Sequence, residues 1–444
     1  MSESRTRRAS VARDKVPFPR VFWVAIGLEV LERMAFYGVY INLTVYLGQS
    51  VGLSDKETGG LMGVFALTRS WIPVLTGALS DKLGFRRSLM LSFTLYVAAY
   101  LSLFAFQSRV GAWSAVMAMA VAGAFLKPVI PGTVRRYAPK GRETQGFSIF
   151  YASVNAGSVV GKIATKIVRT LISLRASMVN SVIGSLVGLL VAYLAFFEPG
   201  KDKSRAELKH AEANPSGKPE TSPPQAAPAA FLPTLLGAVT EVRLIGFLVL
   251  VSGYYLLIEQ FYQTFPVYIV RMFGEKAPRE EITLINPLAI AILQVLVGRL
   301  TKKLPALPAM AFGIFVGSMS MALMGAIPTL WGAAGSFFVF ALAEMIFSPR
   351  YYEYVSSFAP KGREGLYMGL SLVPSGLGGL VGGVLSGRLI SDYLPKGGVL
   401  HPLPIWGTYA AIGVGCSAVL AVFATIFRPP PVVVEAEADT ENPE

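Results

Sequence analysis

The feature that most constrains this chain is a set of charges inside an apolar run long enough to cross a bilayer. Glu29, Glu32 and Arg33 lie in the middle of residues 27–40, and their spacing places all three on one helix face. Each ionised group at a membrane centre costs about 2.5–3.5 kcal/mol on insertion scales, so three facing lipid would cost roughly 8–10 kcal/mol. This face therefore looks into protein or water, where such residues usually mark ion or solute paths. The alternative is a Glu–Arg pair that only locks neighbouring helices.

Composition sets the class of protein. Of the 444 residues, 53% are hydrophobic and 15% are charged, whereas a soluble domain carries about 25% charged residues. We therefore expect an all-α membrane protein, because helices satisfy their own backbone groups inside lipid. The polar, basic N-terminus leads directly into the first span, which argues against a cleavable signal peptide. A single cysteine, Cys416, cannot form a disulfide framework.

Hydrophobic runs predict twelve transmembrane helices in two bundles of six. The spans lie near 20–48, 57–80, 86–107, 111–134, 145–169, 176–197, 242–271, 281–301, 306–328, 330–357, 365–391 and 403–427. Between spans six and seven the chain is rich in Pro, Ala, Lys and Glu without apolar periodicity, which indicates a disordered linker. The expected domains are a basic tail (1–19), an N-terminal bundle (20–197), a linker (198–240), a C-terminal bundle (241–428) and an acidic tail (429–444).

Basic residues indicate the orientation of these spans. They gather in loops that fall on the same side as the basic N-terminal tail, at 81–87, 135–142, 301–303 and 359–363. The positive-inside rule makes this side cytoplasmic, with both termini inside a cell (inner) membrane. Topology thus accounts for much of the net charge of +13, and we expect lipid but no nucleic acid among the partners.

The two halves repeat. The sequence APKGRE occurs at 138–143 and again at 359–364, an offset of 221 that also places Lys127-Pro128 on Ser348-Pro349. Identity at matching positions of two six-helix halves indicates parallel repeats about an axis normal to the membrane. This arrangement resembles the major facilitator superfamily, in which solutes bind near the midplane between the halves.

A second mark of that superfamily is the segment GALSDKLGFRR at residues 77–87. It resembles the superfamily's loop between spans two and three, where glycines allow tight turns. The resemblance implies a conformational latch on the cytoplasmic side, formed by Gly77, Asp81, Gly84, Arg86 and Arg87.

Five motifs together resemble the proton-dependent oligopeptide transporters, the POT or PTR family. The charged segment, Glu29-x-x-Glu32-Arg33 followed by Phe36-Tyr37-Gly38, resembles the family's ExxER and YYG signature. The other motifs are Lys127-Pro128, Phe150-Tyr151-x-x-x-Asn155-x-Gly157-Ser158, the pairs Glu259-Gln260 and Asn286-Pro287, and Glu344 with Ser348-Pro349.

The resemblance implies a proton-coupled symporter that imports di- and tripeptides by alternating access, as a monomer and without a cofactor. A zwitterionic peptide needs cations at one end and a carboxylate at the other, because both charges leave water. By resemblance, the substrate-binding residues are Arg33 and Lys127 for the peptide carboxylate, Glu344 for the amine, and Tyr37, Asn155, Glu259 and Ser348. The proton-coupling residues are Glu29, Glu32, Arg33 and Glu259.

Two of these assignments have simpler alternatives. Lys127 can be a helix-end lysine that snorkels to the interface, although it lies about two helical turns before Arg135, which favours a deeper position. Tyr37 can be an interfacial aromatic residue.

The chain also departs from the family. Many members carry a second arginine seven residues after the ExxER arginine, where it pairs with the glutamate of span seven. Here that position is Tyr40, so Glu259 lacks that partner, and the resemblance leaves its role as a gate open.

Additional cations are not explained by the family. Lys162, Lys166 and Arg169 share the Asn155 face of span five, and Arg69 adds another. Lys166 and Arg169 are expected to snorkel at the outer interface. If Lys162 and Arg69 line the lumen, the site is more cationic than a neutral dipeptide requires, which suggests acidic peptides or another organic anion.

Two further functions remain open: a carrier of a non-peptide or peptide-like organic anion, and a membrane receptor of the same fold that does not transport. Enzymatic activity is not expected, because the sequence has no phosphate-binding loop, no metal-spaced His/Cys cluster and no nucleophile–base pair.

Overall fold

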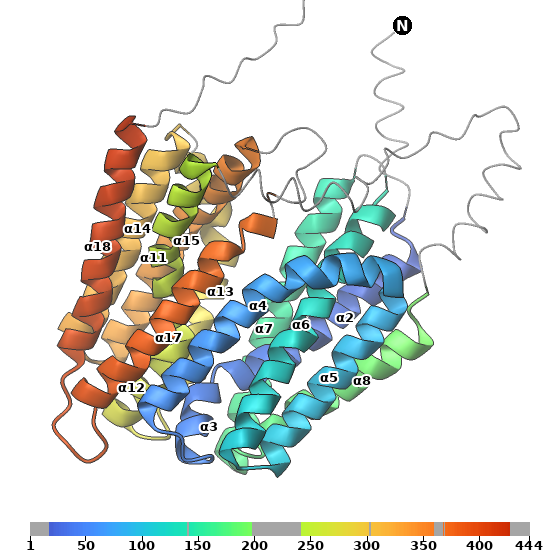
Figure 1. Cartoon of the computed structure of the whole chain (residues 1–444), viewed down its shortest axis with the longest axis horizontal. Helices are drawn as coiled ribbons and strands as arrows, with labels where there is room; N and C mark the ends of the chain where they lie inside the picture. Colours follow the sequence, from blue (N-terminus) through green and yellow to red (C-terminus); the bar gives the residue numbers. More distant parts are fainter. Residues whose placement is uncertain are drawn as a thin grey trace, which may run out of the picture.

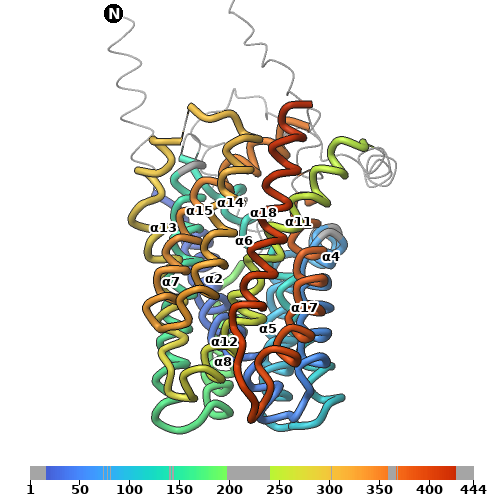
Figure 2. Tube along the Cα trace, turned by 90° about the vertical axis from the view of Figure 1, so that its left-hand side faces the viewer, coloured from blue at the N-terminus to red at the C-terminus, as the bar shows by residue number. Residues whose placement is uncertain are grey.

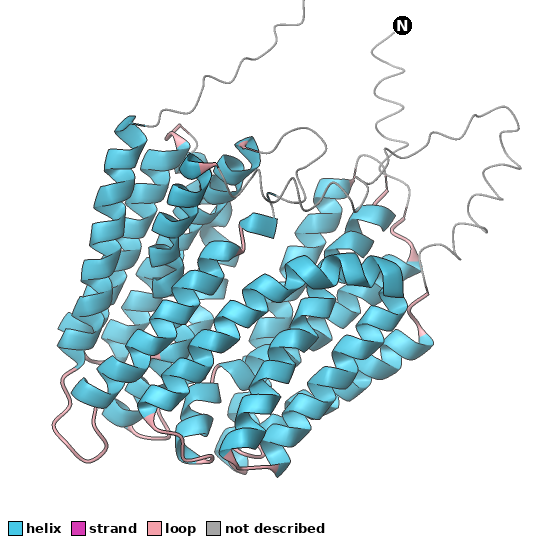
Figure 3. Ribbon diagram, viewed as in Figure 1, coloured by secondary structure: helices cyan, strands magenta, loops and turns pink. Residues whose placement is uncertain are grey.

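The computed structural model describes residues 17–139, 142–197, 241–301, 303–358, 367 and 369–426. Within these residues every regular element is a helix and none is a strand (Figure 3). The predicted linker, the acidic tail, most of the basic tail and the second APKGRE copy lie outside the described residues.

The helices form two bundles, with the N-terminal one on the right of Figure 1 and the C-terminal one on the left. The first contains α2 (Arg20–Tyr40), α3 (Leu43–Gln49), α4 (Asp55–Leu83), α5 (Phe85–Ala105), α6 (Arg109–Tyr137), α7 (Glu143–Leu171) and α8 (Ser177–Leu194). The second contains α11 (Val242–Gln263), α12 (Phe265–Phe273), α13 (Arg279–Thr301), α14 (Ala306–Ala326), α15 (Leu330–Ser357), α17 (Val373–Tyr393) and α18 (Pro402–Ile426). The prediction of an all-α chain with twelve spans is confirmed.

Two predicted spans are each broken into a long and a short helix. The first breaks between α2 and α3 near Asn42, and the seventh breaks between α11 and α12 at Thr264. Pro266 lies in the first turn of α12, where its missing N–H costs no helical hydrogen bond. The repeat offset of 221 moves Asn42 to Gln263, so the two breaks occupy equivalent positions of the two halves.

The long helices fall into two groups by hydropathy. Nine of the described helices are long and apolar enough to cross a membrane. The long helices α2, α4 and α7 fall short of that hydropathy, because they carry the charged residues singled out above. Helices with such charges are stable in a bilayer when the charges face protein or a water-filled cavity.

Besides the short helices α3 and α12, which also touch, the bundles meet along two pairs of long helices, α4 with α17 and α7 with α13. Figure 2 shows these pairs on opposite flanks of the molecule. We call the end where α2 begins the Arg20 side, and the opposite end the α3 side. Glycines allow α4 and α17 to touch: a Cβ added at Gly59 would lie 2.3 Å from the Gly383 carbonyl oxygen.

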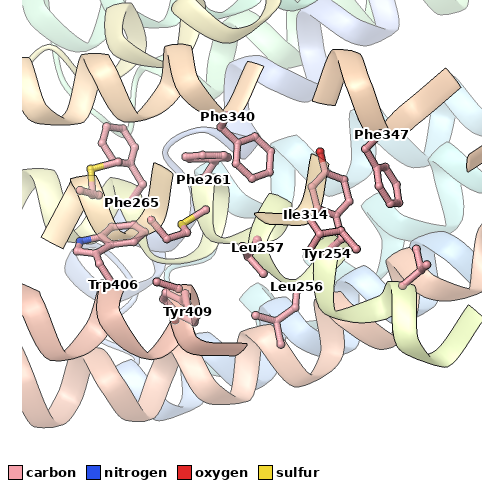
Figure 4. Close-up of a cluster of buried hydrophobic side chains, with 14 of the residues drawn as sticks. Tyr254, Leu256, Leu257, Phe261, Phe265, Ile314, Phe340, Phe347, Trp406 and Tyr409 are labelled. Carbon is pink, nitrogen blue, oxygen red and sulfur yellow. The ribbon is translucent and has the colours of Figure 1, made fainter. Parts of the chain in front are cut away.

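Aromatic side chains fill the C-terminal bundle (Figure 4). The ring of Tyr254 lies 4.0 Å from that of Phe347 and is stacked at 5.7 Å on Phe340. Trp406 is fully buried beside Tyr409. This packing makes the bundle a firm support for the residues of α11 and α15 that face the other bundle.

Close packing of α7 on α2 depends on Gly161, which gives a first prediction. A Cβ at this position would lie 2.2 Å from the Met34 carbonyl oxygen, so Gly161→Ala forces the two helices apart. We expect a loss of about 1–3 kcal/mol, seen as a lower melting temperature in detergent.

The matched control is Gly246→Ala, because no heavy atom lies within 4 Å of a Cβ built there. Alanine is the better helix former, so this control should melt at or slightly above the temperature of the unmodified chain. Equal melting temperatures for Gly161→Ala and the unmodified chain would contradict the close approach.

Candidate functional site

A cavity of about 400 Å³ lies between the two bundles. Its walls come from α2, α4 and α7 of the N-terminal bundle and from α11, α13, α15 and α17 of the C-terminal bundle. A cavity of this volume accommodates a small organic solute. Seven of the predicted binding, coupling or cationic site residues line it: Tyr37, Arg69, Asn155, Lys162, Glu259, Glu344 and Ser348.

The charged segment of α2 forms an ion cluster beside this cavity. The Nε atom of Arg33 lies 3.1 Å from Oε1 of Glu29, and Arg33 is also paired with Glu32. Both glutamates are buried, as the cost of charge in lipid requires. None of the three residues lines the cavity, whereas Tyr37, one turn further along α2, does. Arg33 must therefore leave at least one carboxylate before it can bind a solute.

A tyrosine of α5 forms a hydrogen bond to the ion cluster. The hydroxyl of Tyr96 donates a hydrogen bond of 2.5 Å to Oε1 of Glu32. The Tyr96 ring stacks on that of Tyr100 with centroids 5.5 Å apart. Glu32 is thus shared between a cation of its own helix and a neutral donor of the neighbouring helix.

Lys127 does not line the cavity either. It is partly buried on α6, and its Nζ atom donates a hydrogen bond of 3.2 Å to the backbone carbonyl of Arg69. Neither of the two predicted carboxylate-binding cations, Arg33 and Lys127, therefore lines the cavity.

Glu259 has no arginine partner from the first span, as the sequence indicates, but another arginine pairs with it. Nη2 of Arg69 lies 2.7 Å from Oε1 of Glu259, and the hydroxyl of Tyr40 donates a 2.7 Å hydrogen bond to Oε2. The arginine comes from α4 instead of α2, and Tyr40 keeps its contact with the same carboxylate. Since α4 and α11 belong to different bundles, this buried ion pair connects them across the cavity.

The expectation of snorkelling is wrong for Arg169, which is buried in an ion pair, whereas Lys166 stays partly exposed at the same end of α7. Arg169 makes two hydrogen bonds, of 2.8 and 2.7 Å, to the two carboxylate oxygens of Glu280, and Lys166 pairs with Glu281. Arg169 is only 9% exposed. The first turn of α13 is therefore acidic where the last turns of α7 are basic, and the ion pairs join the bundles on the α3 side.

Further polar contacts close the same side. The amide of Asn42 donates a 2.9 Å hydrogen bond to Glu280 and accepts one from Arg279. Arg271 of α12 holds Asp55 of α4 with hydrogen bonds of 2.6 and 3.1 Å. Together with the α4–α17 glycine contact, these bonds shut the cavity off from the α3 side.

The C-terminal wall of the cavity contains Glu344. Its carboxylate accepts a hydrogen bond of 3.2 Å from the amide of Asn286, and no cation among the described residues lies within ion-pair distance. Across the cavity, the amide of Asn155 donates to the Tyr151 carbonyl at 3.1 Å. The described residues contain no group of three His, Cys, Asp or Glu side chains that could hold a metal ion.

The predicted latch is described only in part. Gly84 joins α4 to α5 with φ of 85°, a conformation that favours glycine. Arg86 donates to the backbone carbonyl of Tyr193 at 2.5 Å, within its own bundle, and Arg87 is exposed. A Cβ at Gly77 would meet only ordinary contact. The side chain of Asp81 lies outside the described residues.

Several site residues were missed in the sequence. Tyr96, Tyr262 and Thr283 lie in apolar runs without a distinguishing pattern. Glu280 gave a usable signal, because an acidic pair opens span eight on the side where span five ends in cations. Asp55 and Arg271 lie 216 residues apart, and only the fold brings them together.

Comparisons with known proteins agree with this architecture. Residues 26–383 match the family model of the Major Facilitator Superfamily. Dipeptide and tripeptide permease A of Pectobacterium carotovorum subsp. carotovorum is 27% identical over 154 residues, covering 34% of this chain and 30% of the permease. The permease A of Salmonella typhi is 29% identical over 154 residues with the same coverages. The match thus spans about 30% of the length of these relatives.

Solved structures resemble almost the whole chain. A POT family transporter in complex with a thioalcohol-conjugated peptide superposes with a TM-score of 0.74 and 18% identity, covering 93% of this chain and 97% of the other. A peptide transporter POT in complex with sulfate gives 0.73 and 17%, with the same coverages. At these identities the likeness shows a shared fold. The relatives are transporters and not enzymes, as expected from the sequence.

Proposed function

Because the chain belongs to the Major Facilitator Superfamily, we propose that it is a proton-coupled symporter that imports small peptides of the di- and tripeptide class by alternating access. The observation that carries this proposal is the convergence of charges from both bundles on one cavity. Glu344 lines it, and within the described part of the chain its carboxylate contacts a neutral hydrogen-bond donor and no cation, so it can receive a peptide ammonium. The named permease relatives and the motifs that resemble the POT family support the same solute class.

Coupling follows from the ion cluster of α2. A proton taken up by Glu29 or Glu32 removes one of the two charges that hold Arg33, and Arg33 can then turn to a carboxylate at the cavity. When the proton leaves, the cluster re-forms and Arg33 releases the solute. Glu259, held by Arg69 across the bundles, is the second proton site, and its protonation would weaken the link between the bundles.

Because the α3 side is closed, the bound solute is released on the opposite, Arg20 side. The basic loops fall on the Arg20 side, which the positive-inside rule assigns to the cytoplasm together with both termini. In this arrangement the cavity is shut off from the outside of a cell membrane and can exchange its contents with the cytoplasm. The proton gradient is the only energy source required, and one chain contains the complete cavity.

The test is uptake into liposomes that contain the purified chain. We expect radiolabelled Ala-Ala to accumulate above its external concentration when the interior is alkaline, and only to equilibrate when an ionophore collapses the gradient. Empty liposomes serve as the control. Peptide binding in detergent without any uptake would instead indicate a receptor, and uptake of organic anions but not peptides would indicate the other carrier class.

A further inference from the structure

Lys162 of α7 is a buried cation that the proposed coupling does not use. It lines the cavity and is 1% exposed. Its Nζ atom donates a 3.3 Å hydrogen bond to the carbonyl of Thr283 and lies 5.5 and 5.8 Å from the ring centres of Tyr37 and Tyr262. No carboxylate of the described residues lies within ion-pair distance of it. A buried ammonium with such partners is poorly compensated for the water it has lost.

The two other cations on the same face of α7 indicate which partner Lys162 lacks. Lys162, Lys166 and Arg169 follow one face of α7, and each contacts the facing helix α13. Arg169 meets Glu280 and Lys166 meets Glu281, but Lys162, the innermost of the three, meets only a backbone carbonyl. The row of ion pairs that joins the bundles therefore lacks its last carboxylate where it reaches the cavity.

The other described charges of the cavity wall do not pair with Lys162. Arg69 is matched by Glu259 at 2.7 Å. Glu344, on the opposite bundle, lacks a cation among the described residues. The cavity thus offers one unmatched cation on the N-terminal bundle and one unmatched carboxylate on the C-terminal bundle. A solute with an ammonium and a carboxylate complements both and would bridge the bundles.

We propose that Lys162 binds a carboxylate of the transported solute, which supplies the missing acid of the α7–α13 row; this inference rests on the proposed function. The carboxylate comes from the C-terminus of a peptide or from an acidic side chain. In either case the Lys162 ammonium gives up its hydrogen bond to the Thr283 carbonyl of α13 and binds the solute carboxylate instead. Binding of the substrate therefore changes a contact between the two bundles.

The test compares two pairs of peptides that differ in one carboxylate. Ala-Ala against Ala-Ala-amide reports the C-terminal carboxylate, and Ala-Asp against Ala-Asn reports an acidic side chain. We expect the unmodified chain to prefer the carboxylate form of one pair by about 10- to 100-fold in half-saturating concentration, the effect of a charge-assisted hydrogen bond. In Lys162→Met this preference should fall several-fold, because Arg33 is then the remaining cation for the carboxylate, while Lys162→Arg should retain most of it.

Lys166→Met is the matched control, since it removes the same group one turn away, where Glu281 already provides the acid. It should leave both preferences unchanged whatever its effect on rate. Unchanged preferences in Lys162→Met, or an equal loss for all four peptides, would overturn the proposal. If the unmodified chain takes up no peptide, the proposed function fails separately, and the same ratios can be measured from the thermal stabilisation that each peptide gives in detergent.

Discussion

Glu32→Gln is expected to abolish proton-driven accumulation of peptide while leaving counterflow exchange at least partly intact. Glutamine keeps the shape of the side chain and a hydrogen-bonding group for Tyr96, but it carries no charge to hold Arg33 and cannot bind or release a proton. Without that step the carrier can exchange bound peptide across the membrane but has no means of using the gradient. Accumulation under an inward proton gradient and exchange at equal pH measure the two activities separately.

Glu57→Gln is the control for this prediction. Glu57 lies in the first turn of α4, and its partner Arg109 is largely exposed, so its replacement should alter neither activity. Gradient-driven accumulation by Glu32→Gln at the level of the unmodified chain would contradict the coupling role of Glu32.

Arg69→Met should reduce peptide uptake by at least about 10-fold. The substitution leaves Glu259 buried with only the Tyr40 hydroxyl as a partner, and loss of one member of a buried ion pair costs about 3–5 kcal/mol. The pair also links α4 to α11, so its loss alters the contact between the bundles. We expect Arg69→Met to lower the melting temperature as well as the uptake rate.

A double-mutant cycle separates the ion pair from other effects of Arg69. Arg69→Met with Glu259→Gln removes both charges, so the double variant should be more stable than Arg69→Met alone. Arg109→Met, which breaks the exposed pair with Glu57, should change stability by about 1 kcal/mol or less. Additive effects of the two substitutions at Arg69 and Glu259 would show that their contact is energetically unimportant.

The fold and much of the cavity lining could be predicted from the sequence, because lipid penalises charge so strongly. Polar residues in apolar runs had to face the interior, and Tyr37, Asn155, Lys162 and Glu344 do line one cavity. The repeat of APKGRE located the two halves, and the two helix breaks fall at equivalent positions within them.

Partners between helices were the part that could not be predicted. Glu259 lacks the arginine of the first span, where Tyr40 stands instead, and the sequence could not show that a long side chain from α4 reaches the same carboxylate. Lys166 and Arg169 were treated as residues of one helix, whereas the acids of α13 lie opposite them. Arg33 was expected to bind solute, but it is paired with the two glutamates of its own helix and does not line the cavity.

Proton movement driven by peptide tests most directly whether a proton and a charged solute exchange partners at this site. Liposomes containing the chain and a pH-sensitive dye, with the membrane potential clamped and no initial pH difference, receive external Ala-Ala. The expected result is that the interior becomes acidic with the unmodified chain and stays unchanged with Glu32→Gln. Entry of radiolabelled Ala-Ala into these liposomes without acidification would contradict it.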